Sequence, residues 1–299
     1  MVLPQSARLH RMLGYIGWPL ALLFVWDIAV TLAYVYLPHP WLNLPVLPMS
    51  LLGSALALFL GFRNNNAYQR WWEGRTLWGA MVNASRSYGR EVYSLIDRTP
   101  ESEKLRHDLV LRQIAYVNAL RCHLRNQPNA DDICDFLPDD EIVALGQVNN
   151  VPNAILNRTA FMLADAAKNG WIDRYSRVQI ETLLVDMSNA QGGMERIKNT
   201  PLPREYAYYP TLFVHAFCIL LPIGLVDSLT IFTPLASTVV GFMLLAMDRI
   251  GADLQNPFAN RPHDVPLTSI CRTIQIDLEQ LLGKTATAKP VQPVANILW

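Results

Sequence analysis

Charged side chains are missing from two long stretches of this 299-residue chain. No Asp, Glu, Lys or Arg occurs in residues 28–62, and Asp227 is the only charged residue in 206–247. A membrane excludes charge from its hydrocarbon over about 20 residues per helical crossing, so each stretch is too long for one crossing. The missing charge argues against an ordinary soluble domain and predicts a membrane protein with paired crossings.

Further scarcities exclude several classes of function. Basic and acidic residues number 25 each, so the chain has no basic surplus for nucleic acid phosphates. The cysteines show no CxxC spacing, which argues against structural disulfides and a zinc site; they are Cys122, Cys134, Cys218 and Cys271. No Gly-rich phosphate loop, HExxH motif or nucleophile with its base is found, so we expect no enzyme, no cofactor and no metal site.

Prolines and turn residues divide each uncharged stretch into two helices. The expected spans are residues 12–37, 48–62, 206–226 and 234–247. The first turn is expected at 38–45 and the second at 227–233, and Pro48 suits the first position of a helix. The first apolar run is too long for a cleaved signal peptide. We therefore predict four transmembrane helices arranged as two hairpins.

Basic residues at the ends of these spans indicate the orientation of the chain. They are Arg8, Arg11, Arg63, Arg70, Arg75, Arg204 and Arg249. Neither expected turn contains Lys or Arg, and the positive-inside bias then places both termini and the middle of the chain in the cytosol. We expect a multi-pass protein of the cell membrane, which in a bacterium is the inner membrane.

The charged middle of the chain is predicted to be helical throughout. Apolar residues recur there at helical spacing, and strand signals are nearly absent. The expected parts are an N-terminal membrane hairpin (1–62), a cytosolic helical domain (63–205), a second membrane hairpin (206–247), and a cytosolic segment with one helix and a loosely held tail (248–299). The predicted fold class is all-α.

The second expected span, residues 48–62, is short and rich in small side chains. At about 1.5 Å per residue it is only ~22 Å long. Such a helix suits packing inside a bundle better than contact with lipid. Because no proline follows until Pro100, we expect it to continue into the cytosolic domain as one long helix.

One side of this span carries an apolar stripe. Leu51, Ala55 and Phe59 follow one another at intervals of four residues and so share a helix face. In a ring of identical subunits this stripe would line a narrow apolar passage. Ordinary helix packing uses the same spacing and is the more common reason for it.

Short motifs spread over residues 45–283 point to a known family. They include Phe59-Leu60-Gly61-Phe62-Arg63-Asn64-Asn65, Glu195-Arg196-Ile197, Thr200-Pro201-Leu202-Pro203, Asn256-Pro257-Phe258 and Asp264-Val265-Pro266-Leu267. With these motifs the chain resembles the bacterial bestrophin homologues. The resemblance implies a homopentameric ion channel in the lipid bilayer, in which each subunit contributes four membrane helices and a cytosolic helical domain around a central pore.

The resemblance also implies two constrictions. The hydrophobic neck of the family maps onto Leu51, Ala55 and Phe59, where alanine is smaller than the usual middle residue. An apolar neck blocks ions by dewetting and conducts when it widens slightly. The cytosolic aperture falls at Tyr175, with Ile172 as the alternative, although this segment equally suits a plain helix start.

The permeant ion is the least determined property. Animal relatives resemble calcium-gated anion channels, whereas the bacterial relatives resemble channels for monovalent cations, so the resemblance favours a monovalent cation here. Residues 63–205 hold 18 basic and 18 acidic residues, and their charge does not decide the matter. Asp264 is the only acid in 256–264, so we expect no calcium clasp. A chloride channel of the same architecture is the first alternative, and a secondary transporter is the second.

Overall fold

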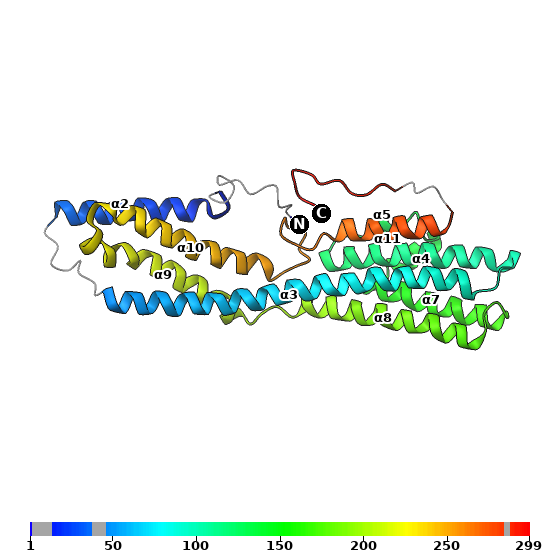
Figure 1. Cartoon of the computed structure of the whole chain (residues 1–299). Helices are drawn as coiled ribbons and strands as arrows, with labels where there is room; N and C mark the ends of the chain where they lie inside the picture. The colour runs from blue at the N-terminus through cyan, green and yellow to red at the C-terminus, as the bar shows by residue number, and fades with distance from the viewer. Residues whose placement is uncertain (2–13, 38–45, 284–287) are drawn as a thin grey trace. The chain divides into compact units, whose positions relative to one another are not determined.

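A computed structural model describes residues 1, 14–37, 46–283 and 288–299, and these residues are mostly helical (Figure 1). The helices are α2 (Trp18–Tyr36), α3 (Val46–Leu95), α4 (Pro100–Arg125), α5 (Ala130–Ile133), α6 (Asp139–Leu145), α7 (Val151–Lys168), α8 (Arg174–Asn199), α9 (Arg204–Leu229), the 3₁₀ turn η2 (Thr230–Phe232), α10 (Thr233–Leu254) and α11 (Leu267–Leu281). Within the described ranges the only β pairing is an isolated bridge between Val294 and Ile297. The all-α fold class is confirmed.

The chain divides into two compact units. Unit 1 comprises Met1–Leu3, Trp72–Thr200 and Pro257–Trp299, and unit 2 comprises Pro4–Trp71 and Pro201–Asn256. Helix α3 contributes its first half to unit 2 and its second half to unit 1. The prediction that the second span continues as one long helix is therefore confirmed.

Unit 2 is a bundle of α2, the first half of α3, α9 and α10. Apolar side chains from these helices form its core: Leu23, Leu56, Leu60, Val214, Phe217, Cys218, Leu221, Leu244 and Leu245. Two of its stretches are long and apolar enough to cross a membrane, Trp18–Tyr36 and Glu205–Leu254. Residues 48–62 are shorter than either stretch, as the sequence indicated.

Polar contacts join α2 to its neighbours inside unit 2. The Asp27 carboxylate is fully buried and accepts hydrogen bonds from Ser237 Oγ and Thr238 Oγ1 of α10, each at 2.9 Å. The hydroxyl of Tyr34 donates to Asp227 Oδ1 of α9 at 2.8 Å. The contacts of Asp27 satisfy a carboxylate that would otherwise be costly in an apolar bundle, whereas Asp227 is exposed.

Two predicted boundaries in unit 2 need correction. The first expected span, 12–37, is interrupted at Gly17, whose φ of 55° suits glycine and ends the preceding helical turn, so α2 begins at Trp18. The second expected turn, 227–233, is shorter than predicted, because α9 continues to Leu229 and only η2 separates it from α10. The other expected turn, at 38–45, lies outside the described residues.

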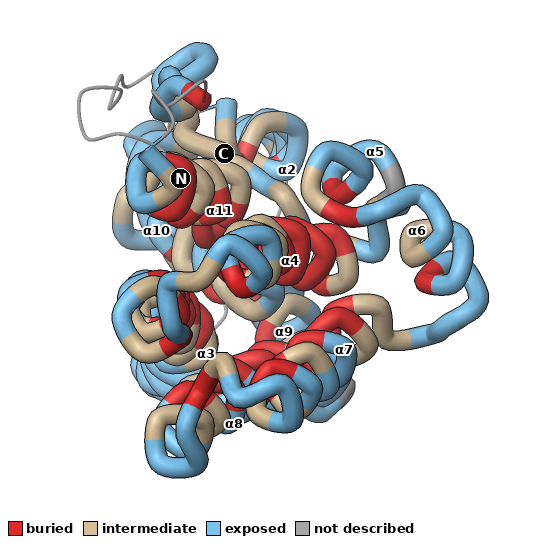
Figure 2. Tube along the Cα trace, turned by 90° about the vertical axis from the view of Figure 1, so that its right-hand side faces the viewer, coloured by how far each residue is buried: buried red, intermediate tan, exposed pale blue. Residues whose placement is uncertain are grey.

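In unit 1 the other helices surround α4. Figure 2 shows α4 mostly buried between α3, α7, α8 and α11. Its predicted apolar face is confirmed, because Leu109, Ile114, Val117 and Leu120 are fully buried. The helix starts with a capping box, in which the Thr99 hydroxyl accepts from Ser102 N at 3.2 Å and Ser102 Oγ accepts from Thr99 N at 3.1 Å.

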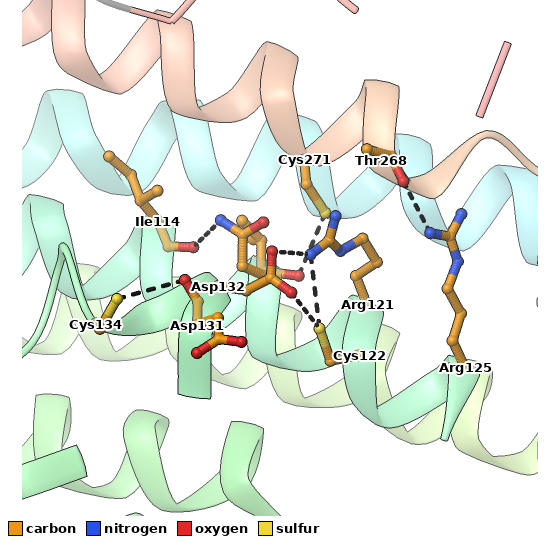
Figure 3. Close-up of polar contacts among 11 residues, drawn as sticks. Ile114, Arg121, Cys122, Arg125, Asp131, Asp132, Cys134, Thr268 and Cys271 are labelled. Atoms are coloured by element: carbon orange, nitrogen blue, oxygen red, sulfur yellow. Dashed lines mark hydrogen bonds and ion pairs between the residues drawn. The ribbon is translucent and has the colours of Figure 1, made fainter. Parts of the chain in front are cut away.

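Polar side chains fill the contact of α4 with α5 and α11 (Figure 3). Arg121 Nη2 lies 2.5 Å from Asp132 Oδ1, and Arg125 Nη1 donates to Thr268 Oγ1 at 2.8 Å. Burial raises the pKa of the Cys122 thiol and raises the pKa of Cys271 to about 12. Both residues therefore remain thiols at neutral pH and act as packing groups.

The end of the chain differs from the loosely held tail that the sequence suggested. The backbone N–H of Ser269 at the start of α11 donates to Trp299 O at 2.7 Å, and Leu298 N donates to Met1 O at 2.9 Å. Ala288 is buried. The described tail residues, 288–299, are thus fixed to unit 1 by backbone hydrogen bonds, which the prolines and small residues of the tail did not reveal.

Candidate functional site

The first half of α3 has one face committed to the core of unit 2. Leu60 and Ala67 are fully buried, and Leu56 is nearly so. Gly53 lies against α9, where a Cβ would come within 3.0 Å of the Phe217 ring. This face fixes the rotation of α3 about its own axis.

The opposite face is apolar and exposed. Leu51, Leu58 and Phe62 are 65%, 62% and 58% exposed. With about 100° per residue in a helix, these three lie within about 40° of one another and opposite Leu60. Among the described residues nothing covers this row of large apolar side chains, which is typical of a surface that contacts lipid or another protein chain.

The predicted neck residues Leu51, Ala55 and Phe59 all lie on the exposed side of α3. They do not share one direction, because steps of four residues advance by about 40° and carry Phe59 about 80° away from Leu51. The Phe59 ring meets the ring of Tyr206 on α9 edge to face, with the centroids 5.8 Å apart. Phe59 is consequently only 36% exposed.

Leu58 and Phe62 were not recognised from the sequence. They continue a second series with the same spacing of four, which begins at Ser54. The polar residue at its start made this series a poorer apolar stripe than the one that begins at Leu51. Only the packed face of α3, seen in the structure, shows which series points away from the bundle.

A third side of α3 carries small residues. Ser54, Ala57 and Gly61 are exposed, and a Cβ on Gly61 would meet nothing within 4 Å. Small side chains allow two helix backbones to approach closely in a membrane. This side of the helix can receive another helix that is not part of the chain.

Amide side chains follow the apolar face toward unit 1. Asn65, Asn66 and Gln69 are exposed, and Asn66 Nδ2 donates to the hydroxyl of Tyr206 at 3.0 Å. The same tyrosine thus contacts both Phe59 and Asn66. The exposed face therefore changes from apolar to polar within two helical turns of Leu58.

The two aperture candidates occupy different environments at the start of α8. Asp173 caps the helix by accepting from Tyr175 N at 2.8 Å and Ser176 N at 3.1 Å, and the hydrogen bonds from Ser176 lower the pKa of Asp173. Tyr175 is 87% exposed, whereas Ile172 is 4% exposed and lies in the core of unit 1. Of these two side chains, only Tyr175 projects into solvent.

The described residues offer no arrangement typical of a metal centre. Within them, no group of three or more His, Cys, Asp or Glu side chains could hold a metal ion. Asp264, the acid in 256–264, is buried and accepts from Arg261 N at 2.9 Å. Burial raises the pKa of the Asp264 carboxyl, which favours its neutral form.

Comparisons with known proteins agree over nearly the whole chain. Residues 7–280 match the family described as bacterial/fungal bestrophin protein. The voltage-dependent anion channel-forming protein YneE of Escherichia coli K12 is 35% identical over 300 residues, covering 98% of this chain and 97% of that protein. The protein of the same name from Salmonella typhi is 36% identical over 262 residues, covering 88% and 85%.

A solved structure gives the same result for the fold. A bacterial bestrophin homologue from Klebsiella pneumoniae superposes with a TM-score of 0.84 at 29% sequence identity. The match covers 89% of this chain and 98% of that chain. The likeness therefore includes both units.

Proposed function

The chain belongs to the bacterial/fungal bestrophin family, and from this premise we propose that it is an ion channel, built from identical subunits around one central pore. The family that the sequence motifs predicted is thereby confirmed, and the protein is a membrane protein. The observation that carries the proposal is the exposed apolar face of α3, which lies opposite its packed face.

A ring of subunits accounts for the exposed sides of α3 together. The small-residue side at Ser54, Ala57 and Gly61 accepts the α3 helix of a neighbouring subunit, and the large apolar side chains then face the axis. Lipid is a poor alternative covering, because residues 48–62 span ~22 Å and the hydrocarbon core is about 30 Å thick. We retain five as the number of subunits, which follows from the sequence resemblance.

Within this ring, Leu51, Leu58 and Phe62 form the constriction, with Ala55 and Phe59 on its flank. An ion that enters such a ring loses hydration and finds no polar substitute, so a narrow neck stays dry and closed until it widens. The exposed amides of Asn65 and Gln69 then return the ion to a polar environment. Tyr175 is the proposed aperture residue, on account of its exposure.

The permeant species is a monovalent ion, and two predictions of its sign compete. The resemblance to bacterial homologues favours a cation. The names of the relatives from Escherichia coli and Salmonella typhi, which describe anion channels, favour the alternative. An uncharged neck does not select by sign, so the choice belongs to charges at the two ends of the pore.

Planar bilayer recordings of the purified protein in asymmetric NaCl test both the channel and the sign. We expect single-channel currents whose reversal potential lies close to the equilibrium potential of one ion. A value near that of sodium supports the cation prediction, and a value near that of chloride supports the anion alternative. The absence of any current from correctly assembled protein would contradict the channel proposal.

A further inference from the structure

Arg63 is the first charged residue after the uncharged stretch 28–62, yet its side chain does not reach water. It is fully buried within unit 2. Arg63 Nη1 lies 2.6 Å from Asp248 Oδ1, and Nη2 donates to the backbone O of Asp248 at 2.7 Å. The guanidinium thus holds both the side chain and the backbone of one residue on α10.

The same carboxylate is shared with a third helix. Thr211 Oγ1 of α9 donates to Asp248 Oδ1 at 2.8 Å, and next to it Asn64 Nδ2 of α3 donates to Met247 O at 2.9 Å. Three helices therefore meet at one charged group. We call the contacts of Arg63, Thr211 and Asp248 the α3 latch.

A glycine on α10 makes this close approach possible. A Cβ on Gly251 would lie 2.1 Å from Asn64 Oδ1, 3.1 Å from Arg63 Nη2 and 3.2 Å from Arg63 Nε. A side chain at that position would therefore require Asn64 and the Arg63 guanidinium to move. The space at Gly251 is therefore filled by the polar groups of α3.

Stability alone is a weak explanation for a buried ion pair. Desolvation of two charges offsets most of their attraction, and apolar residues of similar size commonly stabilise such a site at least as well. A directional contact with two acceptors does fix the position of α3 relative to α10, because the guanidinium matches its acceptors in only one orientation. The latch is suited to fixing the rotation and height of α3.

The position of the latch connects it with the neck. Arg63 follows Phe62 directly, and its side chain leaves the helix about 100° away from that of Phe62, so that Arg63 is buried in the bundle while Phe62 is exposed. Rotation of α3 that broke the contact with Asp248 would also turn Phe62 away from its direction opposite the packed face. In this structure the latch is intact, and Leu58 and Phe62 project away from the bundle.

We propose that the α3 latch holds the neck in its narrow setting, so that Arg63 and Asp248 are positioning residues for gating. This inference rests on the proposed channel function. Loss of the latch frees α3 to rotate, which draws Phe62 off the axis and widens the dry constriction. The latch therefore opposes opening without touching the permeating ion.

The test is the double variant Arg63→Met/Asp248→Leu, which removes both charges together, so that neither charge is left buried alone. Recorded beside the wild type in planar bilayers, it should shift the closed-to-open equilibrium toward open by about tenfold, a change equivalent to ~1.4 kcal/mol between the two states. Reversal potential and the size of the oligomer should stay unchanged. An unchanged or lowered open probability would overturn the proposal.

The matched control is Arg86→Met/Asp277→Leu, which removes an ion pair of 2.7 Å between α3 and α11 in unit 1. Open probability should not change in this variant, and an equal increase would show that the effect is not specific to the latch.

If the first double variant does not assemble, Thr211→Val is the second test. It removes one donor to Asp248 at nearly constant volume, and it should also raise open probability. Normal gating in Thr211→Val would then refute the latch, whereas a silent wild type would refute the channel itself.

Discussion

At the scale of the residue, the direction of a side chain on α3 decides its role. Phe59 and Phe62 are only three positions apart, but the Phe59 ring packs on Tyr206, whereas Phe62 is 58% exposed. Arg63, the next residue, is fully buried. The sequence gives the type of each side chain, and the packed face of α3 determines whether that side chain is buried or exposed.

The two phenylalanines separate the alternative assignments of the neck. Phe62→Ala removes a bulky ring from the proposed constriction, so we expect a clear rise in single-channel conductance or open probability in bilayer recordings. Phe59→Ala is the matched control, and it should change the current less. A larger effect of Phe59→Ala would instead support the stripe Leu51, Ala55 and Phe59.

At the scale of the element, close contacts at glycines determine how α3 packs in each unit. In unit 1 a Cβ on Gly74 would lie 2.9 Å from Phe258 Cζ, 3.1 Å from Phe258 Cε1 and 3.4 Å from Pro257 Cγ. A phenyl ring that is 3% exposed and a proline cannot move aside easily. The Asn256-Pro257-Phe258 motif therefore has a packing role against α3.

We expect Gly74→Ala to destabilise the protein by about 1–3 kcal/mol, the usual cost of overpacking a closed contact. The melting temperature in detergent is the measurement. Gly192→Ala on α8 is the control, because a Cβ there meets nothing within 4 Å and alanine favours a helix by up to about 1 kcal/mol. Equal melting temperatures for Gly74→Ala and the wild type would mean that the segment containing Phe258 shifts without cost.

At the scale of the whole molecule, the described part of the chain leaves two sides of α3 exposed. These are its apolar side and its small-residue side. In the proposed ring, the α3 helices of neighbouring subunits pack against the small-residue sides, and the apolar sides face one another across the pore. Met1 and Leu298 are hydrogen-bonded to each other. This contact places the two on one side of the membrane, which is consistent with the predicted cytosolic termini.

Gly61→Leu tests the assembly separately from the fold. A Cβ at this position meets nothing within 4 Å among the described residues, and the rest of the leucine side chain would occupy the side that receives a neighbouring helix, so we expect oligomers to be lost with little change in helix content. Size-exclusion chromatography with light scattering gives the mass, and circular dichroism gives the helicity. Gly192→Leu serves as the control, and an oligomer of normal size in Gly61→Leu would contradict packing on this side.

Much of the molecule was determined by the sequence itself. The absence of charge from 28–62 and 206–247 predicted the apolar helices, the lack of proline between Pro48 and Pro100 predicted that α3 is one helix, and the motifs predicted the family. These properties depend on the order of residues along the chain and on the preference of each side chain for water or for hydrocarbon. Both can be read from the sequence. For this reason they could be predicted before any contact was known.

Tertiary structure alone decided how α3 is turned and where its charges go. Spacing of four residues describes two stripes equally well, and only the contacts of Gly53, Leu56 and Leu60 with α9 and α10 select the face that remains exposed. The prediction for Arg63 was a place at a membrane edge, and what the structure adds is its burial against Asp248, 185 positions away. Contacts between residues so distant in sequence depend on how the helices pack. Local sequence patterns do not predict that packing.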